Sequence, residues 1–266
     1  MHPIERLRYV ARADEDRPSL LVREAAGALA GFCDDPPGLL TACRRMVDRH
    51  PTLGPMWWLA ARVLCSLNPY EEAWQAADDL EADPTSRVLT GLLPDDGAVL
   101  VVGWPEVVGA AVRRAGAITP FVVDGGGQWS GVIHRIERSG LELVEVPEAG
   151  VGAAVDACNL VLLEASALGP GGFVAPSGSR AAAAVASAAG VPVWVAAGVG
   201  RVLPGRLWEA LAGRVDADPE PWLAEDELIS LDLADSVVGP RGNQSAAEAV
   251  RRADCPIPPE LLKGLP

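Results

Sequence analysis

The sequence has no apolar run long enough to cross a membrane. Its 266 residues contain none of the apolar stretches of roughly 18 residues that a membrane-spanning helix requires. The first 18 residues also lack the apolar core of a signal peptide. We therefore expect a cytoplasmic protein with no membrane among its partners.

Basic residues are few in comparison with acidic ones. The chain has 22 Lys and Arg against 36 Asp and Glu, which gives a formal net charge of −14 at pH 7. A charge of this sign repels phosphate backbones and anionic lipid surfaces. Nucleic acid is therefore not expected as a partner.

Metal ligands and paired thiols are also scarce. The three histidines are spread along the chain, and the five cysteines form no CxxC pair. We expect no metal site and no cofactor, and we interpret the cysteines as reduced core residues. The histidines are His2, His50 and His134, and the cysteines are Cys33, Cys43, Cys65, Cys158 and Cys255.

The residues that are present divide the chain into two halves with different periodicity. Residues 1–93 repeat apolar residues every three or four positions, as in "SLLVREAAGALAGFC", which predicts helices only. After "PDDG", short valine-rich runs alternate with helical segments, which predicts a parallel sheet covered on both faces. The expected strands are 98–103, 117–124, 141–146, 159–166 and 191–198. The sequence therefore predicts an α/β protein with a helical domain (1–93) and a sheet domain (94–266), the latter ending in a helix, a possible edge strand "ELISLDL" and a Pro-rich tail.

Ligands of open α/β sheets bind beyond the carboxyl ends of the strands, near the point where the strand order reverses. After the first expected strand, this rule selects Trp104 as a pocket wall and Glu106 at a helix start. Glu106 serves there either to stabilise the helix terminus or in catalysis. The second expected strand brings Asp124, followed by Gly125–Gly127. That stretch matches neither dinucleotide-binding nor P-loop spacing.

The fourth and fifth expected strands add further candidates. Glu164 and Ser166 follow the fourth, and Gly198 with Arg201 follows the fifth. A glycine-rich and serine-rich loop then leads from Glu164 into an alanine-rich helix, and such a helix start is a common place for an anion to bind.

Ser177 or Ser179 is expected to cap the alanine-rich helix. Arg180 lies in its first turn, where a positive charge is unfavourable for the helix itself. This conflict indicates either a bound phosphate or carboxylate, or merely an exposed side chain. Both readings stay open.

The order of elements resembles one known family. It comprises the α, β and δ regulatory subunits of eukaryotic initiation factor 2B and the isomerases of methylthioribose-1-phosphate and ribose-1,5-bisphosphate. The stretch from "NLVLLEASALG" to "VPVWVAAG", with Gly172 in register, is similar to the family's Gly-Ala-Asp and Asn-Lys region. "HPTLGPMWWLAARV", with His50 and Thr52, resembles an Arg-Pro-Thr that opens a helix lining the sugar-phosphate site.

This resemblance implies a helical N-terminal domain, a Rossmann-like sheet domain and a homodimer formed through the C-terminal domain. It also implies a ligand-binding set composed of Trp104, Gly172, Ser177, Ser179, Arg180, His50 and Thr52. From its position alone, His50 is a helix C-terminal residue, for which a capping role competes with ligand contact.

The family's catalytic residues have no counterparts in this alignment. Its cysteine falls at Gly103 and its aspartate at Ser166, while its Asn-Lys pair falls at Pro176 and Ser177. The arginines fall at His50 and near Gly126. Isomerisation needs an acid/base pair and cations that hold phosphate, so the usual chemistry cannot run with these residues. Glu164, set roughly 6–7 Å further back than Ser166 on the same strand, is a poor substitute.

Three functions remain open at this point. The first is a non-catalytic member of the family that binds a small phosphorylated ligand, a sugar or a nucleotide, or a protein partner. The second is an active aldose-ketose isomerase of a phosphorylated ribose that uses relocated residues, namely Glu106, Asp124, Ser166 and Arg180. The third is an unrelated α/β scaffold that pairs with another protein.

Overall fold

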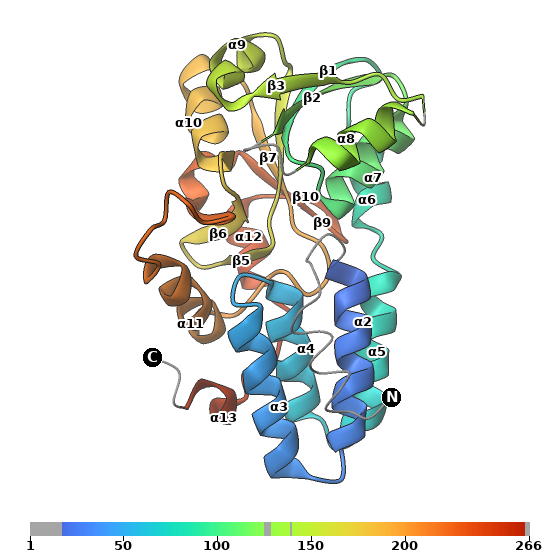
Figure 1. Cartoon of the computed structure of the whole chain (residues 1–266), viewed down its shortest axis with the longest axis vertical. Helices are drawn as coiled ribbons and strands as arrows, with labels where there is room; N and C mark the ends of the chain where they lie inside the picture. The colour runs from blue at the N-terminus through green and yellow to red at the C-terminus, as the bar shows by residue number, and fades with distance from the viewer. Residues whose placement is uncertain (1–17, 125–128, 139, 264–266) are drawn as a thin grey trace.

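The helical half folds into a bundle at one end of the molecule (Figure 1). The structure is a computed structural model that describes residues 18–124, 129–138 and 140–263. Asp35 and Asn68 cap two of the bundle helices by accepting hydrogen bonds from Gly38 N and Glu71 N. Trp57 of α4 is fully buried. The bundle consists of α2 (Pro18–Leu29), α3 (Pro36–Arg49), α4 (Gly54–Cys65) and α5 (Pro69–Glu81), with a 3-10 turn at Ala30–Phe32.

A seven-stranded sheet forms the other half, in the order β10-β9-β7-β4-β1-β2-β3. All neighbouring pairs are parallel except β10 with β9. The five expected strands are confirmed. They are β1 (Gly97–Val102), β2 (Ile118–Asp124), β3 (Val144–Pro147), β4 (Leu160–Glu164) and β7 (Val193–Ala196); β9 (Ser236–Gly239) and β10 (Gly242–Gln244) were not expected.

Helices cover both faces of this sheet, as the continuous apolar strands predict. Val99 and Leu162 face one core, which they share with helices α6, α7 and α8, whereas Leu100 and Leu163 face the opposite core, shared with α9, α10 and α12. The predicted α/β fold class is therefore confirmed. The covering helices are α6 (Thr85–Thr90), α7 (Glu106–Ala115), α8 (Ser130–Glu137), α9 (Val151–Asp156), α10 (Ser179–Ala189) and α12 (Ala246–Arg251), with a 3-10 turn at Glu148–Gly150.

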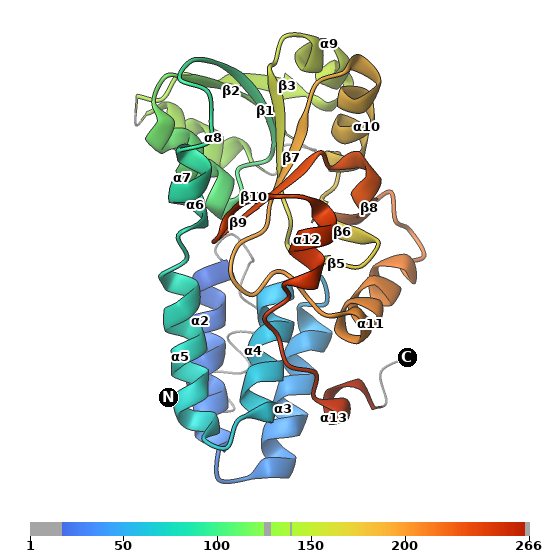
Figure 2. The same ribbon diagram turned by 180° about the vertical axis from the view of Figure 1, so that it is seen from behind.

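The two halves share elements at their border. Leu89 of α6 and Leu93 are buried in a core of the sheet, although both precede the domain boundary predicted at residue 93. In the other direction, the C-terminal tail runs back along the bundle to α13 (Pro259–Leu262), which lies beside α3 (Figure 2). The boundary itself stays a prediction.

The expected glycine-rich loop is largely a β-hairpin. β5 (Ala167–Gly169) and β6 (Gly172–Pro176) pair antiparallel, and β8 (Asp226–Ser230) adds the third strand of a small sheet. β8 covers the start of the expected edge strand, and a 3-10 turn at Leu231–Leu233 follows it. The hairpin strands are short and contain glycine and proline, so their alternation is weak in the sequence. α11 (Gly205–Asp216) packs beside this sheet.

Candidate functional site

The strand order reverses between β1 and β4, so the crevice where ligands of such sheets bind lies beyond the ends of these two strands. Glu164 is the last residue of β4, and α7 begins at Glu106, shortly after β1. The carboxylate of Glu164 accepts hydrogen bonds from Val107 N and Val108 N, at 2.9 and 2.8 Å. The free amides of a helix N-terminus commonly bind an anionic ligand. At the start of α7 the carboxylate of Glu164 takes the place of such a ligand.

Arg201 completes this arrangement. Its Nη2 lies 2.8 Å from Glu164 Oε1, and its Nη1 donates a hydrogen bond to Ala165 O at 2.7 Å. Both charged residues are only 4% exposed. Burial raises the pKa of Glu164, while the charge of Arg201 and the two amide hydrogen bonds oppose the shift. The cation and the helix N-terminus at the crevice are thus both engaged by one internal carboxylate.

An indole ring fills the position where the resemblance places the family's cysteine. Gly103 has φ +64°, and a Cβ there would lie 2.5 Å from Cε2 of Trp129. The neighbouring Trp104 is buried and packs against Gly109 of α7 in the same close manner. Trp129 therefore covers Gly103 at the end of β1, and the conformation of Gly103 disfavours any side chain.

The other residues expected at the sheet edge serve structural contacts. Glu106 accepts a hydrogen bond from Ser19 Oγ at 2.5 Å, and Asp124 accepts one from Trp129 N at 3.0 Å. Ser166 Oγ donates to Val174 O at 3.2 Å within the hairpin. Gly126 and the rest of Gly125–Gly127 lie outside the described residues.

The helical half closes over this edge of the sheet. Ser19 of α2 reaches Glu106, and Gly54 N at the start of α4 donates to Ser166 O at 2.9 Å. Ser19 lies in the first turn of α2, and its side chain makes this contact between the halves. Asp83, between α5 and α6, accepts a hydrogen bond from Val199 N at 2.9 Å. The crevice is therefore bounded by both halves of the chain.

The alanine-rich helix is capped differently from the expectation. Gly178 is the N-cap of α10, with φ +96° and no side-chain cap, so neither Ser177 nor Ser179 caps the helix. Instead, Glu227 Oε1 accepts hydrogen bonds from Gly178 N and Arg180 N, at 2.8 and 2.9 Å. The sequence could not show this cap, because Glu227 lies 47 residues beyond Arg180 in the chain.

Two of the remaining ligand candidates near this helix, Ser177 and Arg180, have polar partners within the protein. Ser177 Oγ donates to Ala224 O at 2.6 Å, and Arg180 Nε lies 3.3 Å from Glu227 Oε2. Ser179 Oγ is buried without a hydrogen-bond partner among the described residues. Gly172 is a buried residue of β6, where a Cβ would lie 2.8 Å from Ile229 O. Its role is therefore tight packing within the small sheet.

A groove of about 740 Å³ joins several of these residues, and we call it the acidic groove. Thr52 lines it together with Arg180, which brings two of the expected ligand residues together. His50 is the buried C-cap residue of α3, which agrees with the capping interpretation. The complete lining is Pro51, Thr52, Gly171, Arg180, Arg214, Val215, Asp216, Asp218, Pro221, Ala224, Glu225, Asp226, Glu227, Leu228, Ile229 and Ser230.

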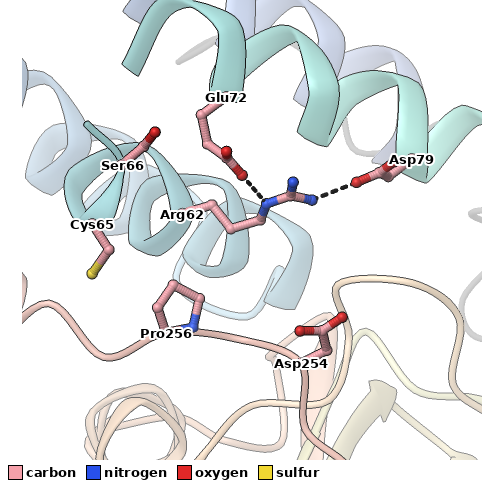
Figure 3. Close-up of a pocket in the computed structure, with 7 residues that line it drawn as sticks. All are labelled: Arg62, Cys65, Ser66, Glu72, Asp79, Asp254 and Pro256. Carbon is pink, nitrogen blue, oxygen red and sulfur yellow. Dashed lines mark hydrogen bonds and ion pairs between the residues drawn. The ribbon is translucent and has the colours of Figure 1, made fainter. Parts of the chain in front are cut away.

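A second cavity, of about 360 Å³, lies between α4, α5 and the C-terminal tail (Figure 3). Arg62 lies in it between Glu72 and Asp79, and its guanidinium lies 4.7 Å from the ring of Trp58. Trp58 Nε1 in turn donates to Asp254 O of the tail at 2.8 Å. No local pattern in the sequence predicts this cluster, in which ion pairs join α4 to α5 and Trp58 binds the tail.

The cysteines show no activated thiol. Burial raises the pKa of Cys43 to about 12 and that of Cys158 to about 11. Burial also raises the pKa of Cys255 to about 12, and Cys65, the exposed one, has a raised pKa as well. None of these four thiols has the lowered pKa that is typical of a nucleophilic cysteine.

In the part of the chain that the structure describes, no cluster of three His, Cys, Asp or Glu residues could hold a metal ion. Nor does any helix among the described residues have the length and apolar character needed to span a membrane.

Several solved structures resemble this chain over nearly its whole length. The Pyrococcus horikoshii OT3 translation initiation factor eIF-2B matches with a TM-score of 0.77 and 13% identity, covering 93% of this chain and 98% of its own. The tetrameric eIF2B-beta2-delta2 complex from C. thermophilum matches with a TM-score of 0.74 and 17% identity, covering 94% and 92%. This chain has the eIF2B fold. No protein-family model matches the sequence, and no curated protein is similar enough to count as a match.

The eIF2B fold is shared with an enzyme. The 5-methylthioribose 1-phosphate isomerase from P. horikoshii OT3 matches this chain with a TM-score of 0.66 and 15% identity, covering 94% of this chain and 85% of its own. The family resemblance seen in the sequence is therefore confirmed at the level of the fold. Because this eIF2B fold accommodates both kinds of protein, the function must be argued from the site residues.

Within this eIF2B fold, the sequence pointed to Glu164 and Arg201 at the crevice through their positions after two strands. The two amides and the arginine that bind Glu164 are contacts that only the structure shows. Trp129 was not connected to Gly103, and Glu227 was missed entirely. The useful signal was a carboxylate and an arginine after adjacent parallel strands, which meet at one edge of the sheet.

Proposed function

We propose that this protein is a non-catalytic protein with the eIF2B fold that works by binding another protein, as a regulatory subunit does. The observation that carries the proposal is that carboxylates of the protein itself bind the N-termini of α7 and α10. Glu164 holds the start of α7 and Glu227 holds the start of α10. A phosphate at either position would have to displace a carboxylate that is already hydrogen-bonded.

The catalytic positions support the same proposal. Gly103 offers no side chain and is covered by Trp129, and Ser166 donates its hydroxyl hydrogen to a backbone carbonyl. Each residue proposed for an isomerase with relocated catalytic groups makes a polar contact within the protein. These residues are Glu106, Asp124, Ser166 and Arg180. A serine without an adjacent base is no general acid or base at neutral pH.

The purified chain is expected to show neither turnover nor thermal stabilisation with methylthioribose-1-phosphate or ribose-1,5-bisphosphate. A ligand present at a hundred times its Kd would add about 2.7 kcal/mol to the free energy of unfolding, which differential scanning fluorimetry detects readily.

Two variants make this experiment decisive. Stabilisation of the wild type by a sugar phosphate that is absent in Arg180→Ala would show a retained ligand site. Turnover that is lost in Asp124→Asn would show an active isomerase with relocated residues. Either result would contradict the proposal of a non-catalytic, protein-binding chain.

We also propose that the chain assembles as a homodimer through its C-terminal half. The support is the similarity to subunits that, in the solved complex, form a tetramer of two kinds of chain. Sedimentation velocity is expected to give twice the chain mass of 27.7 kDa at micromolar concentration. A monomer at all concentrations would reject the homodimer while leaving binding to a different protein open.

A further inference from the structure

The acidic groove has features that the sheet-edge crevice lacks. It is open, its volume is about 740 Å³, and it is lined by the loop before α4, the turn between β5 and β6, the end of α11 and the whole of β8. It therefore spans residues from both halves of the chain. A site of this construction is accessible to a partner in a way that the buried Glu164 and Arg201 pair is not.

Negative charge dominates the lining. Five carboxylates face two arginines, and within the described residues both arginines already have carboxylate partners. Arg180 pairs with Glu227, and Arg214 pairs with Asp48 through Nη2 at 2.5 Å while its guanidinium lies 4.9 Å from the Trp57 ring. The net negative electrostatic potential of the lining favours a positively charged ligand. The carboxylates of the lining are Asp216, Asp218, Glu225, Asp226 and Glu227.

Two large apolar side chains stand exposed at the rim. Trp222 is 75% exposed and Leu223 is 71% exposed, and they lie in the chain between the lining residues Pro221 and Ala224. Adjacent exposed apolar residues beside a groove are typical of an interaction site. Tryptophan is also among the residue types that contribute most to binding energy at interfaces.

The segment that carries Trp222 is held by hydrogen bonds. Leu223 N donates to Glu220 O at 2.8 Å, and Glu220 N donates to Asp218 Oδ1 at 2.9 Å. On the other side of the tryptophan, Ser177 binds the backbone oxygens of Ala224 and Glu225, at 2.6 and 2.8 Å. The exposed indole is therefore presented by an anchored turn, which lowers the ordering cost of binding.

We propose that the acidic groove binds an arginine-rich segment of a partner protein. A guanidinium can stack on the indole of Trp222, and its forked N–H groups match the carboxylates of the lining. Leucine or another apolar residue of the segment covers Leu223. A second copy of this chain, with its net charge of −14, is a poorer electrostatic match, and nucleic acid is repelled.

This inference rests on the proposed protein-binding function and names the chemistry of the partner. The test uses the full chain and a fluorescein-labelled eight-residue peptide that alternates arginine and leucine, followed by fluorescence anisotropy at about 0.15 M salt. A peptide that alternates glutamate and leucine serves as the charge-reversed probe. Only the arginine peptide is expected to bind.

Two groove variants each have a matched control elsewhere on the surface. Trp222→Ala is expected to weaken binding about tenfold, whereas Tyr70→Ala, at an exposed aromatic residue of α5, leaves it unchanged. The triple variant Asp216→Asn/Asp218→Asn/Glu225→Gln is expected to weaken it about tenfold or more. The control triple variant removes three exposed carboxylates near β3 and is Glu142→Gln/Glu145→Gln/Glu148→Gln.

Equal losses in the two triple variants would reduce the binding to a general effect of net charge and overturn the proposal. No binding of the arginine peptide, or equal binding of the glutamate peptide, would overturn it as well. None of these outcomes affects the non-catalytic function, which is judged separately by the turnover and stability measurements with sugar phosphates.

Discussion

Replacing Glu164 with alanine is expected to lower the free energy of unfolding by about 3–5 kcal/mol. The change leaves the buried guanidinium of Arg201 without its carboxylate, and it leaves Val107 N and Val108 N without their acceptor. An uncompensated buried charge is among the most destabilising results of a single substitution. Urea denaturation followed by far-UV circular dichroism measures the loss.

A double-mutant cycle separates the ion pair from the helix contact. Arg201→Met should be destabilising by itself, and Glu164→Ala/Arg201→Met should cost less than the sum of the two single variants. Glu148→Ala, at an exposed glutamate, is the matched control and should stay within about 0.5 kcal/mol of the wild type. Strict additivity of the two buried substitutions would contradict the interpretation of Glu164 and Arg201 as one unit.

Acetate offers a second measurement on the Glu164→Ala variant. The deleted atoms correspond to an acetate ion, and the two amides and Arg201 that would bind it remain in place. Stabilisation of this variant by acetate beyond that of the wild type is expected if the crevice is an anion site occupied by its own side chain. Equal stabilisation of both proteins would count against that description.

Gly103→Ala is expected to lower the free energy of unfolding by about 2–4 kcal/mol, because backbone strain and overpacking act together. The residue has φ +64°, and its Cβ would lie 2.5–2.9 Å from three atoms of the Trp129 indole. Chemical denaturation compared with the wild type gives the value. The same obstacle applies to any attempt to place a cysteine at this position.

Gly116 provides the matched control for this prediction. It has a similar φ of +71°, but a Cβ there would meet nothing within 4 Å. Gly116→Ala should therefore report backbone strain without a side-chain clash, at about 1–3 kcal/mol. If Gly103→Ala and Gly116→Ala prove equally destabilising, Trp129 does not fill the position. Gly103→Ala/Trp129→Ala should cost less than the sum of the two single variants, by the part that is due to the clash.

These two sites bear on function as well as on stability. In an enzyme, residues of a substrate crevice are usually held ready for a ligand at some cost to stability. Here Glu164 binds both Arg201 and the N-terminus of α7, and Trp129 covers Gly103. We expect the loss of any of these side chains to destabilise the fold. These crevice contacts thus stabilise the protein, and the proposed partner site is the separate acidic groove.

The sequence by itself was sufficient for the main architecture. Apolar runs of residues such as 98–103 and 159–166 predicted parallel strands because both faces of such strands are buried. Helical periodicity predicted the bundle for the same reason, since each helix buries one stripe. The strands β9 and β10 were missed because they are short and carry little alternation.

Position after a strand was also enough to nominate Glu106, Asp124, Glu164 and Arg201, because parallel strands end at one edge of the sheet. What these side chains do was decided only by tertiary structure. Glu164 reaches an amide 57 residues away, and Glu227 caps a helix through the amide of Arg180, 47 residues before it. Hydrogen bonds and buried charges depend on distances in space, and no local pattern records which carboxylate fills which helix terminus.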